Sequence, residues 1–275
     1  MFSTIDLSPR ISTEIRADRK MLLDGAKAAQ IRRLLEQRGV LVFRQINFDD
    51  QEQLVFSRTL GELADQGLTD RKLIKVSLDK EEQKETPYLA DYLRGSFFWH
   101  IDGSADESPY LGSVLTAKRL SDTGGQTEFA NTYAAYEALP EAEKATIAGL
   151  KVVHTLEASQ RYVNPEPKYE ELLGWQRLRP RVHPLVWTHR SGRKSLLLGS
   201  TATRIEDMDI EEGNLLLCHL REWATQPQFI YRHEWMPGDM IIWDNTGTMH
   251  RVTPYSPDSG RMMHRTTLLG EERVA

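Results

Sequence analysis

Hydrophobic residues in the N-terminal part of the chain follow the spacing of helices and of one buried strand. Between Leu22 and Gln37 the apolar positions recur at intervals of three and four residues, which predicts an amphipathic helix. Gly39 can end that helix in the left-handed conformation, and the apolar run 40–43 that follows predicts a short buried strand. Asp49 and Asp50 precede a second helical pattern and can cap it.

After Phe97 the pattern changes to short apolar runs separated by turn residues, which is typical of β-strands. Two helical stretches interrupt them, Tyr133–Ala148 with a break at Pro140, and Glu211–Thr225. Many short strands with a few helices predict a mainly β fold, a sandwich or barrel with flanking helices. The predicted strands are Leu111–Leu120, Thr127–Ala130, Leu150–Thr155, Arg181–Thr188, Ser195–Leu198, Ile230–Trp235, Met240–Trp243, Met249–Thr253 and Met262–Leu269.

Residues 66–96 show neither the helical nor the strand spacing of apolar residues, and they include a run of charged residues from Lys80 to Glu85. A loop of this length inside a compact domain is usually a functional lid or disordered. No repeat and no linker-like composition divides the chain. We therefore predict one domain over residues 1–275, with residues 66–96 as a loop.

Composition narrows the classes of function. The 275 residues include 35 Lys and Arg against 40 Asp and Glu, and the resulting net charge of −5 argues against a nucleic-acid-binding protein. Cys218 is the only cysteine, which excludes an internal disulfide and a cysteine-ligated zinc cluster and suits a reducing compartment. The N-terminus lacks the apolar core of a signal peptide, and no apolar run reaches the roughly 18 residues of a membrane span. We expect a cytoplasmic protein that does not bind membranes.

A histidine and an aspartate at strand spacing form the first candidate for chemistry. Among the eight histidines, only His100 has a carboxylate two positions away in a β-like setting, that of Asp102. The period of two places both side chains on one face and turns Ile101 into the core. Together they offer two adjacent corners of a metal site. The tripeptide alone is a weak signal for a metal site, since this spacing mostly marks a surface or hydrogen-bonded pair.

The C-terminal segment favours the metal interpretation. His250 follows a strand that is predicted to be buried, and Arg261 and Arg265 are an even number of residues apart on the next strand, so they can share a face. Two histidines and one carboxylate leave open positions, as in non-heme Fe(II) oxygenases. Those positions can accept a 2-oxo acid and O₂. An arginine suits the far carboxylate of 2-oxoglutarate, and Thr127 can add a hydroxyl donor.

Further segments complete a series that runs in order along almost the whole chain. They are 39–44, Trp99–Asp102, Gly124–Ala130, Ala134–Leu139, His183–Pro184, Gly192–Leu196, Ala224–Pro227, Trp243–Asn245 and His250–Arg265. This series resembles the taurine dioxygenase family of Fe(II)/2-oxoglutarate-dependent dioxygenases. Within that family it is most similar to the dichlorophenoxyacetate (aryloxyalkanoate) dioxygenases.

The resemblance implies a fold and a set of roles. The implied fold is the double-stranded β-helix, a cupin-like jelly roll, with residues 66–96 as the substrate lid. The implied cofactors are Fe(II), the cosubstrate 2-oxoglutarate and O₂, and members of the family are often dimers or tetramers. The residues that match are His100, Asp102 and His250 as catalytic iron ligands, Thr127 and Arg265 at the distal carboxylate of 2-oxoglutarate, and Arg261 as a second arginine near the cosubstrate.

One departure concerns the substrate. After the ligand aspartate, better-known members carry small polar residues and then an aromatic, whereas this chain has Ala105, which should enlarge that wall of the pocket. We predict hydroxylation of a small anionic molecule, with the aryloxyalkanoate type and ether cleavage favoured, and release of succinate and CO₂.

Several alternatives stay open at this stage. A related enzyme could hydroxylate a sulfonate, an alkyl sulfate or an amino-acid-like metabolite. A jelly-roll binding protein could keep the metal without catalysis. A zinc hydrolase could use the same three ligands, although the sequence offers no distinctive general base for it.

Overall fold

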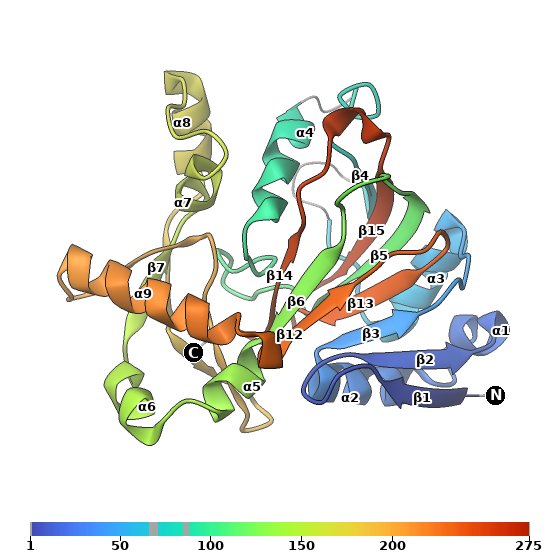
Figure 1. The fold of residues 1–275 in the computed structure, drawn as a ribbon, viewed down its shortest axis with the longest axis horizontal. Coiled ribbons are helices and arrows are strands. Elements are labelled where there is room, and N and C mark those ends of the chain that lie inside the picture. Colours follow the sequence, from blue (N-terminus) through green and yellow to red (C-terminus); the bar gives the residue numbers. More distant parts are fainter. Residues whose placement is uncertain (1, 66–70, 85–87, 275) are drawn as a thin grey trace.

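The computed structural model describes residues 2–65, 71–84 and 88–274. Strands from both ends of the chain form the largest sheet, in the order β1-β2-β3-β13-β5-β15-β4 (Figure 1). Neighbouring strands are antiparallel, except that β2 and β3 are parallel. The strands are β1 (Phe2–Asp6), β2 (Thr13–Ala17), β3 (Val40–Phe43), β4 (Leu73–Val76), β5 (Gly112–Arg119), β13 (Met240–Asp244) and β15 (Met262–Leu268).

Smaller antiparallel sheets complete the β structure. One has the order β12-β6-β14, and in Figure 1 its strands lie in front of the large sheet. The others have the orders β11-β7-β8 and β10-β9. Their strands are β6 (Thr127–Asn131), β7 (Lys151–His154), β8 (Arg181–Pro184), β9 (Val186–Thr188), β10 (Lys194–Leu196), β11 (Ala202–Ile205), β12 (Ile230–His233) and β14 (Thr248–Val252).

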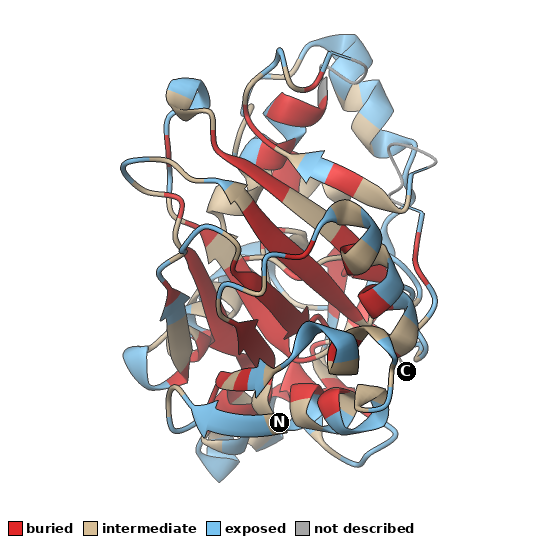
Figure 2. Ribbon diagram, turned by 90° about the vertical axis from the view of Figure 1, so that its right-hand side faces the viewer, coloured by how far each residue is buried: buried red, intermediate tan, exposed pale blue. Residues whose placement is uncertain are grey.

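Helices cover the outside of the sheets, and Figure 2 shows buried strands at the centre with exposed helical surfaces around them. Within residues 2–65, 71–84 and 88–274, no helix has the length and hydrophobicity that a membrane span needs. The α-helices are α1 (Arg19–Leu23), α2 (Ala28–Arg38), α3 (Asp50–Leu60), α4 (Tyr88–Leu93), α5 (Thr132–Glu137), α6 (Glu141–Ile147), α7 (Leu156–Arg161), α8 (Tyr169–Gln176) and α9 (Ile210–Ala224). Short 3-10 turns occupy Arg94–Phe97, Pro227–Phe229 and Pro257–Ser259.

Both faces of the large sheet are buried, because its central strands send alternate residues into two cores. Val42 and Trp243 point into the core that also holds Phe129 of β6, between the two sheets. Leu41 and Ile242 point the other way, into the core under α2 and α3. This arrangement explains why the sequence of β3 is a continuous apolar run rather than an alternating one, and the predicted strand 40–43 is confirmed.

The predicted helix over Leu22–Gln37 is wrong near its N-terminal end, because Leu22 and Leu23 belong to a separate helix and the second helix begins at Ala28. Gly25 adopts a left-handed conformation with φ of +74°, and the carboxylate of Asp24 accepts a hydrogen bond from the backbone N–H of Ala26 at 2.9 Å. This local turn separates α1 from α2. Gly39 ends α2 with φ of +70°, as predicted.

Two other predictions need correction. The single strand over Arg181–Thr188 is interrupted at Leu185 into β8 and β9. The predicted loop over residues 66–96 contains β4 and α4 in its described part, because β4 gains order by pairing with β15, which local periodicity cannot show. Residues 66–70 and 85–87 of that loop lie outside the described residues.

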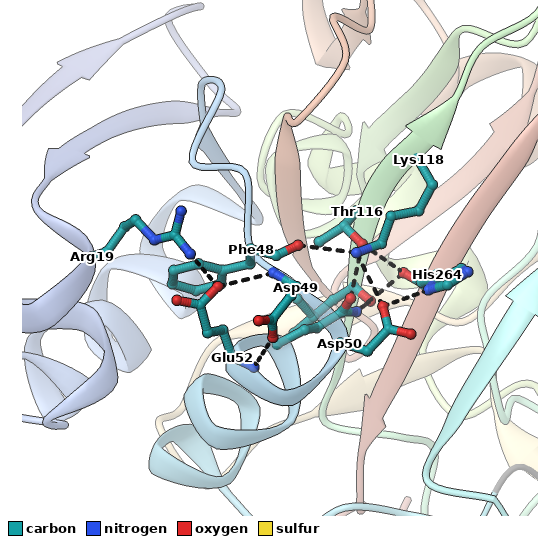
Figure 3. Close-up of polar contacts among 10 residues, drawn as sticks. Arg19, Phe48, Asp49, Asp50, Glu52, Thr116, Lys118 and His264 are labelled. Atoms are coloured by element: carbon teal, nitrogen blue, oxygen red, sulfur yellow. Dashed lines mark hydrogen bonds and ion pairs between the residues drawn. The ribbon is translucent and has the colours of Figure 1, made fainter.

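A polar network at the start of α3 fixes that helix to the large sheet (Figure 3). Asp49 caps α3, as predicted, and the structure adds a reciprocal capping box with Glu52, whereas Asp50 is the first residue of the helix. Asp50 Oδ1 lies 2.7 Å from Nδ1 of His264 on β15 and 3.0 Å from Nζ of Lys118 on β5. His264 therefore faces α3, and strand alternation turns its neighbour Arg265 to the opposite, inner face.

Acid is expected to destabilise the fold, because buried imidazoles resist protonation. Burial lowers the pKa of His154 to about 3 and that of His189 to about 4, whereas imidazoles of an unfolded chain titrate near about 6.5. The unfolded state thus binds more protons below that pH, so this stability is complete above about pH 6.5 and is lost as the pH falls. Each such histidine contributes a slope of about 1.4 kcal/mol per pH unit.

Urea unfolding at about pH 7.5 and about pH 5.5 tests this expectation. From the higher to the lower pH, the free energy of unfolding should fall less in His154→Asn than in the parent protein. The difference should equal the contribution of one histidine. His219→Asn, which changes an exposed imidazole in the same way, is measured beside it as the control for the loss of a histidine. Equal pH dependence in His154→Asn and the parent would contradict the assignment.

Candidate metal centre

The two histidines of the predicted site face each other across an antiparallel bridge. His100 precedes a turn, and His250 lies on β14. Their backbones exchange both hydrogen bonds, from His100 N to His250 O at 3.0 Å and from His250 N to His100 O at 2.9 Å. The ring centroids are 4.1 Å apart. Residues far apart in the sequence are thus held side by side by the main chain itself.

Asp102 completes a cluster of three candidate ligands. One ligand atom from each of His100, Asp102 and His250 lies within 4.8 Å of the others. Ile101 between the first two is 2% exposed and belongs to the hydrophobic core, so the predicted alternation is correct. The structure therefore brings together the three residues that the sequence singled out as metal ligands.

The protonation states of this cluster suit a cation. Burial alone would raise the pKa of Asp102, but the positive charge of Arg265 and the hydrogen bond from Ser113 favour the ionised carboxylate, so this pKa lies well below its usual value. Burial lowers the pKa of both His100 and His250, so the imidazoles are neutral near pH 7. A carboxylate with two neutral imidazoles is the protonation state in which these side chains bind a divalent metal.

Distances within the cluster fit a metal better than direct hydrogen bonds. Nε2 of His100 is 3.8 Å from Asp102 Oδ1, and Nε2 of His250 is 3.8 Å from Asp102 Oδ2. Both separations exceed the range of a hydrogen bond. Nδ1 of His100 lies 2.8 Å from the carbonyl of Phe98, which fixes the tautomer that leaves Nε2 as a donor of electrons to a metal. The residues present therefore fit a divalent cation held between them.

Arg265 lies beside this cluster. It is on the inner face of β15, and its Nη1 is 3.5 Å from Asp102 Oδ2. Its side chain is 20% exposed. A guanidinium so close to the metal ligands is in position to neutralise an anion that binds next to them.

Thr127 and Arg261 occupy a neighbouring region, around the turn that precedes β6. Thr127 is 4% exposed, and its hydroxyl oxygen accepts a hydrogen bond from Nε1 of Trp235 at 2.9 Å, which leaves the hydroxyl proton to be donated elsewhere. Arg261 is 3% exposed and donates from Nη2 to the carbonyl of Gly125 at 3.1 Å. Its guanidinium carbon lies 4.7 Å from the ring centroid of Tyr255. Arg261 thus braces the glycine turn in front of Thr127.

The comparisons with known proteins point to one family. The family described as "Taurine catabolism dioxygenase TauD, TfdA family" matches residues 3–267 of the 275. The chain belongs to this family. The predicted family and the predicted enzyme class, a dioxygenase, are confirmed.

Named relatives resemble this dioxygenase over most of its length. An alpha-ketoglutarate-dependent 2,4-dichlorophenoxyacetate dioxygenase of Burkholderia sp. (strain RASC) is 35% identical over 263 residues, which covers 90% of this chain and 87% of the relative. An (S)-phenoxypropionate/alpha-ketoglutarate-dioxygenase of Sphingobium herbicidovorans is 32% identical over 85% of this chain and 83% of the relative. The crystal structure of AAD-2 in complex with Mn(II) and N-oxalylglycine superimposes with a TM-score of 0.89 at 33% identity, covering 100% of this chain and 99% of the other.

Two contacts of the dioxygenase site had no signal in the sequence. Ser113 of β5 donates a hydrogen bond from Oγ to Asp102 Oδ2 at 2.9 Å. Gly199 packs against the backbone of His100, with φ of +120°. Neither residue belongs to a motif with metal-binding spacing, and only the pairing of distant segments reveals their role.

Gly199→Ala should weaken both the fold and the metal centre of this dioxygenase. An added Cβ would lie 3.0 Å from His100 Cα and 3.2 Å from the carbonyl oxygen of Trp99. The unfavourable φ and the collision together should cost about 1–3 kcal/mol of unfolding free energy. The shift of His100 should lower the affinity for a divalent metal, measured by calorimetric titration with Co(II).

Gly192→Ala is the matched control for this prediction. Gly192 has a similar left-handed φ of +84°, but nothing lies within 4 Å of an added Cβ. It should therefore show the backbone strain without any change in Co(II) affinity. If Gly199→Ala binds Co(II) as tightly as Gly192→Ala does, the contact with His100 does not matter for the metal centre.

Proposed function

We propose that this protein is an Fe(II)- and 2-oxoglutarate-dependent dioxygenase that hydroxylates a small anionic molecule of the aryloxyalkanoate type and cleaves its ether bond. The observation that carries the proposal is the cluster of His100, Asp102 and His250 in a chain of this dioxygenase family. The predicted iron and 2-oxoglutarate agree with the alpha-ketoglutarate dependence in the relatives' names.

In this proposal His100, Asp102 and His250 are the catalytic residues that hold Fe(II). The support is their two neutral imidazoles and one carboxylate around a common point, with Nε2 of each imidazole turned toward Asp102. Iron and 2-oxoglutarate, once bound with O₂, supply the oxidising chemistry. The chain supplies one carboxylate and two imidazoles in fixed positions. Asp102 is already ionised and both imidazoles are already neutral before a metal binds.

Arg265 and Thr127 hold the distal carboxylate of 2-oxoglutarate in this proposal, with Arg261 nearby. The support is the buried hydroxyl proton of Thr127 and the guanidinium of Arg265 beside the metal cluster. Arg261 supports the turn that carries Thr127. The AAD-2 structure was solved with Mn(II) and N-oxalylglycine, an amide analogue of 2-oxoglutarate, which is consistent with a metal and a dicarboxylate in one site.

The finer fold assignment belongs to the same proposal. Two facing, largely antiparallel sheets with an inner core, and candidate metal ligands on β14 and at the bridge beside it, support a double-stranded β-helix or jelly roll. We also propose that residues 1–275 form one domain and that the described part of the 66–96 segment, including α4, borders the substrate. The dimer or tetramer and the cytoplasmic location stay predictions.

The substrate preference follows from chemistry and from the relatives' names. Hydroxylation of the carbon that bears an ether oxygen gives a hemiacetal-type product, which collapses to a carbonyl compound and a phenol. One 2-oxoglutarate and one O₂ are consumed for each succinate, CO₂ and hydroxylated product. The names of two relatives, a dichlorophenoxyacetate and a phenoxypropionate dioxygenase, support this choice.

Substrate-dependent succinate formation tests the proposal. A panel of aryloxyacetates, both enantiomers of aryloxypropionates, sulfonates, alkyl sulfates and amino acids is incubated with the enzyme, Fe(II), 2-oxoglutarate and O₂. We expect equal amounts of succinate and phenol with an aryloxyalkanoate. If only sulfonates, alkyl sulfates or amino acids supported succinate formation, the proposed substrate class would be wrong and the proposed reaction class would stand. Zn(II)-dependent hydrolysis without succinate, or Co(II) binding without turnover of any compound, would contradict the proposed reaction.

A further inference from the structure

Three buried side chains form a directed chain of hydrogen bonds that ends on the candidate metal ligand Asp102. Trp243 donates from Nε1 to Oδ1 of Asn245 at 2.8 Å, and Asn245 donates from Nδ2 to Oγ of Ser113 at 3.1 Å. Ser113 then donates to Asp102 Oδ2 at 2.9 Å. Trp243 is 2% exposed, and Asn245 and Ser113 are 0% exposed.

The direction of each hydrogen bond is fixed by the first donor. An indole N–H can only donate, so Trp243 determines which end of the Asn245 carboxamide is the carbonyl oxygen and which is the NH₂ group. The NH₂ group donates to the Ser113 oxygen. The single hydroxyl proton of Ser113 is therefore donated to Asp102. The carboxylate can only accept and ends the chain. Buried networks whose members are all satisfied hold one arrangement and disfavour others.

The same indole contacts a second ligand. The ring centroids of Trp243 and His250 are 4.6 Å apart, and Phe129 packs on the same imidazole with centroids 6.2 Å apart. Trp243 therefore packs against His250 with its tilted ring and is linked to Asp102 by its N–H through Asn245 and Ser113. Two ligands on separate segments of the chain are coupled to one buried side chain.

We propose that Trp243, Asn245 and Ser113 are positioning residues that set the orientation of Asp102 and His250 for metal binding. Asp102 Oδ2 accepts the Ser113 hydroxyl and lies 3.5 Å from Nη1 of Arg265, so Oδ1, which is 3.8 Å from Nε2 of His100, is the oxygen that would be left for a metal. This inference rests on the proposed function, because it takes the cluster of His100, Asp102 and His250 as the metal centre.

Ser113→Ala is the central test, because it removes the hydrogen bond to Asp102 together with the acceptor of Asn245 Nδ2, and leaves the Trp243 ring beside His250 in place. The probe is Co(II), titrated calorimetrically into the full-length, metal-depleted protein and followed by its visible absorption, which reports the ligand geometry. We expect the dissociation constant for Co(II) to rise roughly 10- to 100-fold, the range found when partners of metal ligands are removed. The Co(II) absorption band should change shape as well.

Ser57→Ala provides the matched control. Ser57 is also a 0% exposed serine with one side-chain hydrogen bond, to Oγ1 of Thr266 at 2.7 Å, but it lies on α3 at the outer face of the large sheet. Urea unfolding of both variants shows whether they are folded and similarly destabilised. The control should bind Co(II) with parental affinity and an unchanged spectrum, so a general loss of stability cannot imitate the effect.

Trp243→Phe separates the two contacts of the indole. It keeps an aromatic ring beside His250 but removes the N–H that orients Asn245, so we expect a smaller loss of Co(II) affinity than with Ser113→Ala. Ser113→Ala with a Co(II) affinity within twofold of the parent and an unchanged spectrum would overturn the network. A parent protein that binds no Co(II) would instead overturn the proposed metal centre itself, so the two failures are distinguishable.

Discussion

Asp102→Ala is expected to lower the rate of substrate-dependent succinate formation by at least about a thousand-fold, equivalent to about 4 kcal/mol of transition-state stabilisation. Asp102 supplies the only carboxylate in the cluster, and the charge of Arg265 keeps it ionised despite burial. Without it, two neutral imidazoles face a cationic arginine, which disfavours a divalent metal. Asp102→Asn keeps the shape but loses the charge and should fail in the same way.

Glu107→Ala serves as the control for this loss. Glu107 is an exposed acidic residue a few positions further along, paired with Arg273 at 3.0 Å, so the variant makes the same change in net charge away from the cluster. It should retain parental turnover. Asp102→Ala with more than about a tenth of parental activity would contradict the ligand assignment.

Arg265→Ala is expected to raise the KM for 2-oxoglutarate roughly a hundred-fold, or about 3 kcal/mol, with a smaller effect on kcat. The guanidinium of Arg265 lies beside the candidate metal ligands. In the proposal it pairs with the distal carboxylate of 2-oxoglutarate. Arg265→Lys should give an intermediate KM, because an ammonium cannot form the paired hydrogen bonds of a guanidinium. Initial rates at varied 2-oxoglutarate concentration measure both constants.

Arg119→Ala and Arg261→Ala accompany this measurement. Arg119 is 54% exposed and pairs with Glu82, so its loss should leave the KM unchanged. An unchanged KM in Arg265→Ala together with a raised KM in Arg261→Ala would assign the distal carboxylate to Arg261. An unchanged KM in both variants would remove the arginines from cosubstrate binding.

The elements that the sequence predicted well are those whose signals are local. Gly39 adopts the left-handed conformation that a helix end needs, and Asp49 forms a capping box with Glu52. The strand that became β3 is apolar throughout because both of its faces are buried. In each case a few neighbouring residues determine the conformation by themselves.

The elements that the sequence did not predict depend on distant partners. β1 is largely exposed and has no apolar alternation, yet it pairs with β2 along its whole length. β4 pairs with β15, which lies at the other end of the chain. Backbone pairing of this kind does not require a pattern of apolar side chains. The sequence of β4 therefore predicts a loop.

The candidate site shows the same division. The spacing of His100 and Asp102 was informative because strand alternation applies even over a short extended segment. His250 was a candidate because it follows a buried strand, the resemblance to a family gave it the role of a ligand, and the structure places it beside His100 by a backbone bridge. Ser113 carried no signal, and Asn245 belonged to the matching segment Trp243–Asn245 without any role being assigned to it, since a serine and an asparagine acquire their role from what surrounds them.

The bridge between His100 and His250 also has a thermodynamic consequence. It closes a loop that spans positions 100 to 250, so a metal that joins the two imidazoles would act as a reversible cross-link on most of the β structure. Because unfolding separates the two imidazoles and releases the metal, the free energy of metal binding adds to the stability of the native state. Metal at about a hundred times its dissociation constant would stabilise the native state by about 2.7 kcal/mol. The supply of metal would then set the lifetime of the folded protein as well as its activity.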